Sequence, residues 1–243
     1  PVFAHVPMIL GEDKQKLSKR HGATAVTDFR KSGYLPEAMI NALARLGWSK
    51  GDQELFSLKE LCASFDLEGC GDSASVFDRK RLDWLNAHYL KLADKDRIVG
   101  LIKEIYGLDF TRIFAGASGE RLYKAITERA TTLKDYEKQL SWALKNDVEW
   151  DQAAKDQVFA AWKPEVLKSF VTKLETFGAD DFVEEKLTAT LKATVTECGA
   201  KFPDLGKPVR ILLTGGLSGP DLGLILQTLG RENSLKRLKN TPV

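Results

Sequence analysis

Apolar residues recur at intervals of three and four over most of the chain after residue 34, and this spacing constrains the fold more than any other feature. It is the spacing that places side chains on one face of an α-helix. The clearest example runs from Leu35 to Leu46, with Pro36 suited to the first turn and Gly47 to the end. An alternating strand pattern is nearly absent outside Val2 to Leu10. The sequence therefore predicts a mainly α-helical protein.

Several helices are expected to start at polar residues that can cap them. The candidate caps are Ser57 with Glu60 in capping-box spacing, Asp78, Asp94, and Thr132 with Asp135, again in capping-box spacing. Later helices are expected over residues 119–129, 132–145, 151–162, 164–177, 181–198, 208–213, 218–229 and 232–239. Gly178, Gly199 and Gly230 stand where left-handed helix ends are expected.

Composition sets wide bounds on the class of protein. The 243 residues suffice for one large or two moderate domains, and 36 lysines and arginines against 34 aspartates and glutamates leave a net charge of +2. That charge neither indicates nor excludes nucleic-acid binding, which can depend on local basic patches. Cys62, Cys70 and Cys198 form no even disulfide framework and indicate reduced thiols in a cytoplasmic protein. No apolar run approaches the ~20 residues of a membrane span.

Two other patterns are rejected as sites. His5, His21 and His88 lack the spacing and carboxylate neighbours of a metal site, so no metal, and in particular no zinc, is expected. Residues 214–220 are rich in glycine but lack the Lys-Ser/Thr ending of a phosphate loop. We expect them to connect two helices, with Ser218 as the cap of the second.

The strongest functional pattern lies near the start of the chain. It reads Lys16-Leu17-Ser18-Lys19-Arg20, directly after the apolar run that ends at Leu10. In a turn, the ammonium groups of Lys16 and Lys19 can converge on one phosphate. The other interpretation is an ordinary solvated basic loop.

This segment resembles the KMSKS loop of bacterial glutamyl-tRNA synthetases, which are class I aminoacyl-tRNA synthetases. Leu17 takes the place of the methionine and Arg20 that of the final serine, and Arg20 matches the glutamyl subgroup. The resemblance continues in the same order along the chain. Its further landmarks are residues 33–38, 43–49, 76–86, 208–210 and 218–220, whereas the stretch 94–206 carries only a helical pattern.

The resemblance implies two domains and one reaction. Residues 1–93 would form the end of the catalytic domain, with the KMSKS-type loop, plus a stem-contact helical domain. Residues 94–243 would form an all-helical anticodon-binding domain, an α-helix cage. The parent protein would be a glutamate–tRNA ligase, a cytoplasmic enzyme that activates glutamate with ATP and transfers it to tRNA(Glu). The alternative is a stand-alone, non-catalytic tRNA-binding module.

The chain starts at Pro1, directly before the loop, and we infer a carboxyl-terminal fragment of a longer polypeptide. The missing half would carry the HIGH motif and the amino-acid pocket, so the fragment alone is expected to be inactive. ATP and glutamate would bind only when that half is present. The expected partner is tRNA(Glu), and we expect a monomer that does not bind membranes.

The resemblance also assigns roles to single residues. Lys16 and Lys19 would face the ATP phosphates and serve catalysis. Ser18 would support the loop or donate to phosphate, and Met8 and Ile9 would meet the adenine ring through their backbone groups. Mg²⁺ is expected to accompany ATP.

A second group of cations is expected to bind RNA. Arg79, Lys80 and Arg81 crowd the first turn of the helix that Asp78 caps. Cations at this end oppose the helix dipole, a cost that an approaching tRNA phosphate would cancel. Without the resemblance, an ordinary solvated basic turn explains them equally well. The corner at residues 129–132 is a candidate for reading the third anticodon base.

Overall fold

The computed structural model describes residues 3–18, 20, 22 and 25–241. The chain divides into two compact units. The first comprises Pro1–Asp109 and Thr127–Tyr136, and the second comprises Phe110–Ile126 and Glu137–Val243. Residues 94–109 therefore pack within the first unit. The functional boundary expected after residue 93 concerns RNA-binding roles and stays a prediction.

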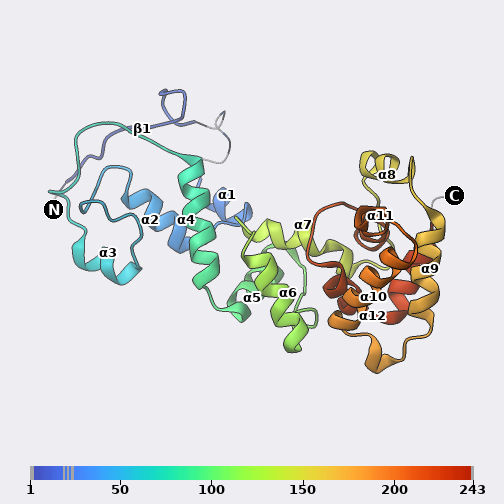
Figure 1. Cartoon of the computed structure of the whole chain (residues 1–243). Coiled ribbons are helices and arrows are strands. Elements are labelled where there is room, and N and C mark those ends of the chain that lie inside the picture. Colours follow the sequence, from blue (N-terminus) through green and yellow to red (C-terminus); the bar gives the residue numbers. More distant parts are fainter. Residues whose placement is uncertain (1–2, 19, 21, 23–24, 242–243) are drawn as a thin grey trace. The chain divides into compact units, whose positions relative to one another are not determined.

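The first unit is built from short helices around an aromatic and aliphatic core. Its elements are β1 (Ile9–Leu10), α1 (Val26–Lys31), α2 (Pro36–Ala44), α3 (Leu58–Ser64), β2 (Ser75–Val76), α4 (Arg79–Leu92) and α5 (Lys95–Tyr106). Figure 1 shows α2 between α3 and α4, and α2 packs against both. Phe29, Met39, Leu82 and Leu85 are buried between these elements. The expectation of a mainly α-helical protein is confirmed.

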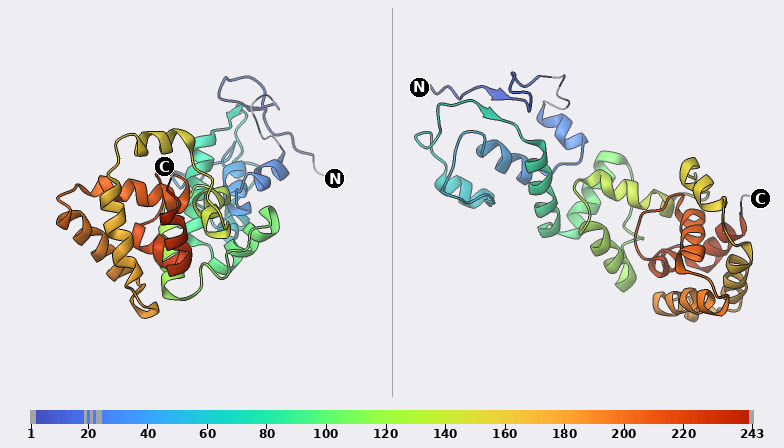
Figure 2. Two further views of the ribbon diagram at one scale, coloured as in Figure 1. Left: turned by 90° about the vertical axis from the view of Figure 1, so that its right-hand side faces the viewer. Right: turned by 45° about the horizontal axis from the view of Figure 1, so that its top comes forward.

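The second unit is a helical bundle, well seen in Figure 2. Two helices, α6 (Gly116–Thr127) and α7 (Leu133–Leu144), are shared with the first unit at one end each. The others are α8 (Gln152–Phe159), α9 (Pro164–Glu175), the 3₁₀ turn η2 (Ala179–Asp181), α10 (Glu184–Glu197), α11 (Phe202–Thr214) and α12 (Leu222–Lys239). Helix α12 packs against α9, α10 and α11.

The helix caps expected at Ser57, Asp78 and Asp94 are present. The Ser57 side chain accepts from the Glu60 N–H at 3.2 Å, and the Glu60 carboxylate accepts from the Ser57 N–H at 2.7 Å. Asp78 and Asp94 cap α4 and α5 through the N–H groups of Arg81 and Arg97, each at 3.1 Å. Before α7, the Asp135 carboxylate accepts from the N–H groups of Thr131 and Thr132, each at 2.8 Å.

Two expectations about where helices start in the second unit are wrong. Helix α11 begins at Phe202 instead of Pro208, because Pro203 occupies its first turn and the Asp204 carboxylate accepts from the Lys201 N–H at 3.0 Å. Ser218 does not cap the next helix, which starts after Asp221.

Of the expected left-handed glycines, Gly199 and Gly230 have positive φ values, whereas Gly178 is extended. Gly230, with φ 74° and ψ 170°, interrupts the helical backbone inside α12. The helix end expected there is confirmed, and α12 consists of two helical segments on either side of it.

Gly33 allows a close approach inside the first unit. Its φ is +91°, and a Cβ atom there would lie 2.7 Å from the Leu133 nitrogen. The Leu133 N–H donates to the Gly33 carbonyl at 3.0 Å. The buried Asn86 side chain supports the same junction, since it accepts from the Leu35 N–H at 2.7 Å and donates to the Thr131 carbonyl at 2.6 Å. A larger residue at position 33 would separate these segments.

Arg237 has a comparable role in the second unit, where it is only 7% exposed. Its guanidinium donates to the carbonyls of Leu213 at 2.6 Å, Trp142 at 2.9 Å and Lys145 at 2.5 Å. These carbonyls lie at the carboxyl ends of α7 and α11. One cation therefore satisfies acceptors that the two helices leave unpaired.

Within the part of the chain that the structure describes, no helix has the length and apolar character needed to cross a membrane.

Candidate nucleic-acid interface

The KMSKS-type segment follows a short strand that is fixed on both sides. Strand β1 pairs in parallel with β2, with Ile9 opposite Ser75 and Leu10 opposite Val76. The Phe77 N–H donates to the Leu10 carbonyl at 2.8 Å, and the Leu17 N–H donates to the Ile9 carbonyl at 3.0 Å. The first bond joins the end of β1 to the residue after β2, and the second joins Leu17 back to β1.

Between these ends the chain makes a tight turn. The Gly11 N–H donates to the Gln15 carbonyl at 2.8 Å, and Lys14 adopts a positive φ of 59°. The Asp13 carboxylate accepts from the Gln15 N–H at 3.0 Å. Lys16 follows directly, in a bridge with Leu10, and its side chain is exposed. The turn thus presents Lys16 to solvent, where a phosphate could reach it.

The other residues expected to bind ATP have mixed surroundings. Met8 is 53% exposed, whereas Ile9 packs against the core of the first unit. Ser18 is half-buried. Lys19 lies outside the described residues, so its expected convergence with Lys16 stays a prediction.

Arg20 contacts the turn itself. Its guanidinium donates to the Asp13 carboxylate at 3.2 Å and to the Gln15 side-chain oxygen at 2.5 Å. Arg20, the last residue of the KMSKS-type segment, therefore stabilises the turn that precedes Lys16.

The three cations in the first turn of α4 have different surroundings. Lys80 is exposed, and no ion pair among the described residues involves it. Arg79 is half-buried, with its guanidinium 5.2 Å from the centre of the Phe29 ring and 5.8 Å from that of Tyr34. Such cation–π contacts hold the guanidinium beside the two rings. Arg81 forms an ion pair within the protein.

Tyr34 links Arg79 to the body of α4. Its hydroxyl donates to the Asp83 carboxylate. The pKa of Tyr34 is raised to about 12. Burial is the largest cause and Asp83 adds to it, whereas Arg79 opposes the rise. At neutral pH the Tyr34 hydroxyl is therefore protonated and can donate to Asp83.

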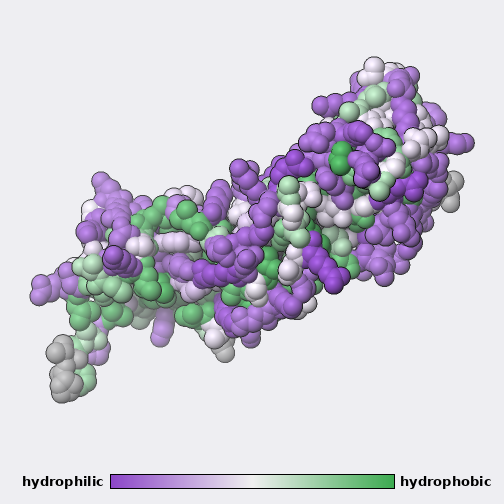
Figure 3. Space-filling view, turned by 90° about the horizontal axis from the view of Figure 1, so that it is seen from below, coloured by the Kyte–Doolittle hydropathy of each residue, from purple (hydrophilic) through white to green (hydrophobic). Residues whose placement is uncertain are grey.

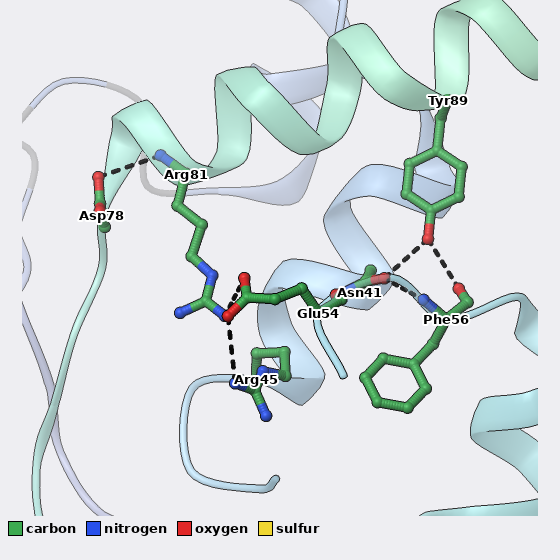
Figure 4. A network of polar contacts seen from close by, with 7 residues as sticks. All are labelled: Asn41, Arg45, Glu54, Phe56, Asp78, Arg81 and Tyr89. Atoms are coloured by element: carbon green, nitrogen blue, oxygen red, sulfur yellow. Dashed lines mark hydrogen bonds and ion pairs between the residues drawn. The ribbon is translucent and has the colours of Figure 1, made fainter. Parts of the chain in front are cut away.

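Arg81 and Arg45 converge on one carboxylate, that of Glu54 (Figure 4). The Arg81 Nη2 atom lies 2.5 Å from Glu54 Oε2, and the Arg45 Nη2 atom lies 3.6 Å from Glu54 Oε1. The side chains of Glu54 and Arg81 are 44% and 35% exposed, whereas Arg45 is only 13% exposed. This cluster carries two positive charges and one negative charge.

A buried asparagine holds the segment that bears Glu54. The Asn41 side chain donates to the Glu54 carbonyl at 2.9 Å and accepts from the Phe56 N–H at 2.8 Å (Figure 4). The Tyr89 hydroxyl lies 2.7 Å from both Asn41 Oδ1 and the Phe56 carbonyl oxygen, and can donate to either. Burial raises the pKa of Tyr89. Helices α2 and α4 together fix the backbone at residues 54–56.

Sequence reasoning missed Glu54 and Arg45 as members of this surface. Arg45 stands in the family landmark 43–49, but nothing in the sequence shows that it meets Arg81, 36 positions later in the numbering. Glu54 lies in a short polar stretch with no periodicity. Only the packing of α2 against α4 brings the three side chains together.

The corner at residues 129–132 is fixed from two sides. The Thr131 carbonyl accepts from Asn86, and the Asp135 carboxylate accepts from the N–H groups of Thr131 and Thr132, each at 2.8 Å. Arg129 is exposed at this corner. Its expected role in reading an anticodon base stays a prediction.

A hydrophobic hollow of about 360 Å³ is a different kind of surface. Figure 3 shows hydrophobic residues gathered on the face of the first unit that it draws. The hollow is lined mainly by aliphatic side chains of α1, α2 and α5, and its two arginines are paired, Arg30 with Glu104 and Arg97 with Glu37. These pairings make it a poor phosphate site.

Among the described residues, no three His, Cys, Asp or Glu side chains gather as metal ligands. The three cysteines are free thiols.

Comparison with known families defines the class of protein. Residues 84–242 match the family model described as anticodon binding domain, and residues 1–84 match the model described as tRNA synthetases class I (E and Q), catalytic domain. The chain therefore belongs to the anticodon binding domain family, and its first third matches the class I synthetases.

The relatives make the assignment more specific. The chain is 41% identical to the glutamate–tRNA ligase of Syntrophotalea carbinolica, over 98% of this chain and 51% of that protein. It is 42% identical to the glutamate–tRNA ligase of Syntrophobacter fumaroxidans, over 99% of this chain and 51% of that protein.

A solved structure agrees with these relatives. The crystal structure of a glutamate tRNA ligase from Elizabethkingia meningosepticum, in complex with its amino acid, matches at 27% identity with a TM-score of 0.77, over 98% of this chain and 51% of that one. The resemblance to glutamyl-tRNA synthetases expected from the sequence is confirmed. The chain spans about half the length of the relatives it matches.

Proposed function

We propose that this chain is the part of a glutamate–tRNA ligase that supplies the KMSKS-type loop and binds tRNA(Glu). One observation carries the proposal: the loop and the basic first turn of α4 both follow strands that are paired with each other. Strand β1 leads into the loop, β2 leads into Asp78 and α4, and the two strands are paired. A tRNA that contacts α4 would therefore meet a surface fixed relative to the loop that contacts ATP.

In the proposed enzyme the loop assists the activation of glutamate. Negative charge builds on the α-phosphoryl group and on the departing pyrophosphate in the transition state. The ammonium groups of Lys16 and Lys19 would stabilise that charge, and loss of one such donor typically costs on the order of 10²-fold to 10³-fold in rate. Ser18 would support the loop, Met8 and Ile9 would meet the adenine ring, and Mg²⁺ would accompany the ATP phosphates.

RNA recognition divides between the two parts of the chain. Arg79, Lys80 and Arg81 would contact tRNA phosphates, because a helix N-terminus offers charge and amide donors without the geometry to read bases. The helices after residue 93 would bind the anticodon, whose unstacked bases can be read by stacking and hydrogen bonds. The parent enzyme would act as a cytoplasmic monomer.

The role of the loop is tested in the full-length enzyme with Lys19→Ala. We expect the rate of glutamate-dependent pyrophosphate exchange to fall at least tenfold, with tRNA affinity nearly unchanged. Lys14→Asn is the matched control, since it removes the same charge from the same loop and asparagine tolerates positive φ. An exchange rate for Lys19→Ala equal to that of the control would refute the catalytic role.

The 243-residue chain by itself is expected to bind tRNA weakly and to catalyse no glutamate activation. Exchange activity in a preparation free of full-length protein would contradict this. The alternative function, a stand-alone tRNA-binding module, predicts that no HIGH-type segment is found in the open reading frame some two hundred residues upstream.

A further inference from the structure

We propose that Arg45 and Arg81 form a binding site for an RNA backbone phosphate, and that the Glu54 carboxylate occupies this site until RNA displaces it. The inference rests on the proposed tRNA-binding function and adds a competing group within the protein. It also brings in Arg45 and Glu54, which lie outside the basic turn of α4.

The charges of the cluster support this. Two guanidinium groups face a single carboxylate, so one positive charge remains uncompensated. At 3.6 Å the Arg45 contact is too long for a good hydrogen bond, and the Nε and Nη1 atoms of Arg45 are buried without a hydrogen-bond partner among the described residues. The Nε and Nη2 atoms of Arg81 are in the same condition, although Nη2 lies close to Glu54. Glu54 therefore satisfies the two arginines only in part.

The exposure of the three side chains indicates how an anion would enter. Glu54 is the most exposed of them and Arg45 the least. An incoming phosphate meets the carboxylate and the outer part of Arg81 first, and can contact Arg45 only when the carboxylate has moved away. Since Asn41 fixes the backbone of residues 54–56, a rotation of the Glu54 side chain suffices for this exchange.

A phosphodiester can occupy the place that the carboxylate vacates. Its two non-bridging oxygens accept hydrogen bonds as a carboxylate does, and guanidinium groups bind phosphate through parallel N–H donors. The same RNA strand can also meet the exposed Lys80 in the first turn of α4. In the protein without RNA, the Glu54 carboxylate would prevent Arg81 from binding other anions strongly. A tRNA, which binds through several phosphates at once, would displace this carboxylate.

The test is a titration of the full chain with a tRNA(Glu) transcript at several salt concentrations. Glu54→Gln removes the competing charge while keeping the size of the side chain. We expect its tRNA affinity to rise at least threefold at low salt, with a salt slope steeper by about 0.7 to 0.9 for each further RNA phosphate that the protein neutralises. Glu68→Gln is the matched control, because Glu68 is an exposed carboxylate of the same unit. We expect it to change affinity less than twofold.

Arg45 is tested in the same background. Glu54→Gln combined with Arg45→Met should lose the increase in affinity, while Glu54→Gln combined with Arg45→Lys, which keeps the charge, should retain part of it. Thermal unfolding of each variant verifies that it folds. If the Arg45→Met combination does not fold, the Arg45→Lys combination and the single Glu54→Gln and Glu68→Gln variants still decide the outcome.

Equal affinities for Glu54→Gln and Glu68→Gln would overturn the inference, as would an increase that persists unchanged without Arg45. The proposed function fails by a different result, namely that replacing Arg79, Lys80 and Arg81 by alanine leaves tRNA affinity and its salt slope unchanged. A triple variant that weakens binding, together with equal glutamine variants, refutes the Glu54 exchange alone.

Discussion

In the first unit, two asparagines connect distant segments of the chain, whereas in the second unit an arginine does so. Asn41 and Asn86 are fully buried, and each both donates and accepts hydrogen bonds with backbone groups outside the helices. Arg237 only donates, and its three partners are carbonyls at the ends of α7 and α11. The two kinds of side chain therefore stabilise different kinds of junction.

The difference follows from the donor and acceptor inventory of each group. An amide can satisfy both an N–H and a carbonyl, and segments outside helices and strands leave both kinds of group unpaired. A guanidinium has only donors, and its charge is favourable at helix C-termini, where the dipole is negative. Burial lowers the pKa of Arg237, against the nearby Asp147. The second unit thus depends on a buried charge and the first on neutral groups.

The largest expected effect comes from removing that charge. Arg237→Met should lower the free energy of unfolding by about 3–5 kcal/mol, because three carbonyls lose their donor in a buried place. Urea denaturation measures the change. Lys236→Met is the matched control, since its exposed ion pair with Asp147 is worth about 0–1 kcal/mol. A loss below about 1 kcal/mol for Arg237→Met would show that the cation is dispensable.

Asn86→Ala should have a smaller effect, about 2–3 kcal/mol, because it leaves the Leu35 N–H and the Thr131 carbonyl without their partner. Hydrogen exchange should accelerate at residues 33–35 and 131–133 in the first unit and remain unchanged around Arg237. Asn146→Ala, at an exposed position of the second unit, is the control. Faster exchange throughout both units would show that the two junctions are not independent.

The smallest effect concerns pH. The pKa of Tyr34 is raised to about 12 by burial and by Asp83, from an ordinary value near 10. The stabilisation is therefore fully present below pH 10 and is lost as the pH rises towards 12, because the unfolded chain loses the Tyr34 proton first. Between these values, the wild type should lose stability with pH more steeply than Tyr34→Phe. Parallel slopes in urea denaturation would contradict the raised pKa.

Local signals determined where many helices begin. Ser57, Asp78 and Asp94 predicted starts that the structure confirms, because a cap bonds to amides two or three residues away and needs no distant partner. The start of α11 was missed although Pro203 and Asp204 are comparable local signals, since the apolar run after Pro208 drew the prediction to the wrong turn. The break at Gly230 was also predicted locally, because glycine adopts a positive φ without a steric penalty.

The sequence by itself determined the helical character, the caps and the family, because each depends on residues that are near one another in the chain or that follow in a recognisable order. It also identified Lys16, Lys19 and the basic turn of α4 as candidates. Only the tertiary structure decided that Arg81 meets Arg45 at Glu54 while Lys80 remains exposed. The physical reason is that an ion pair depends on distance in space, and the packing of α2 against α4 sets the distances between these side chains.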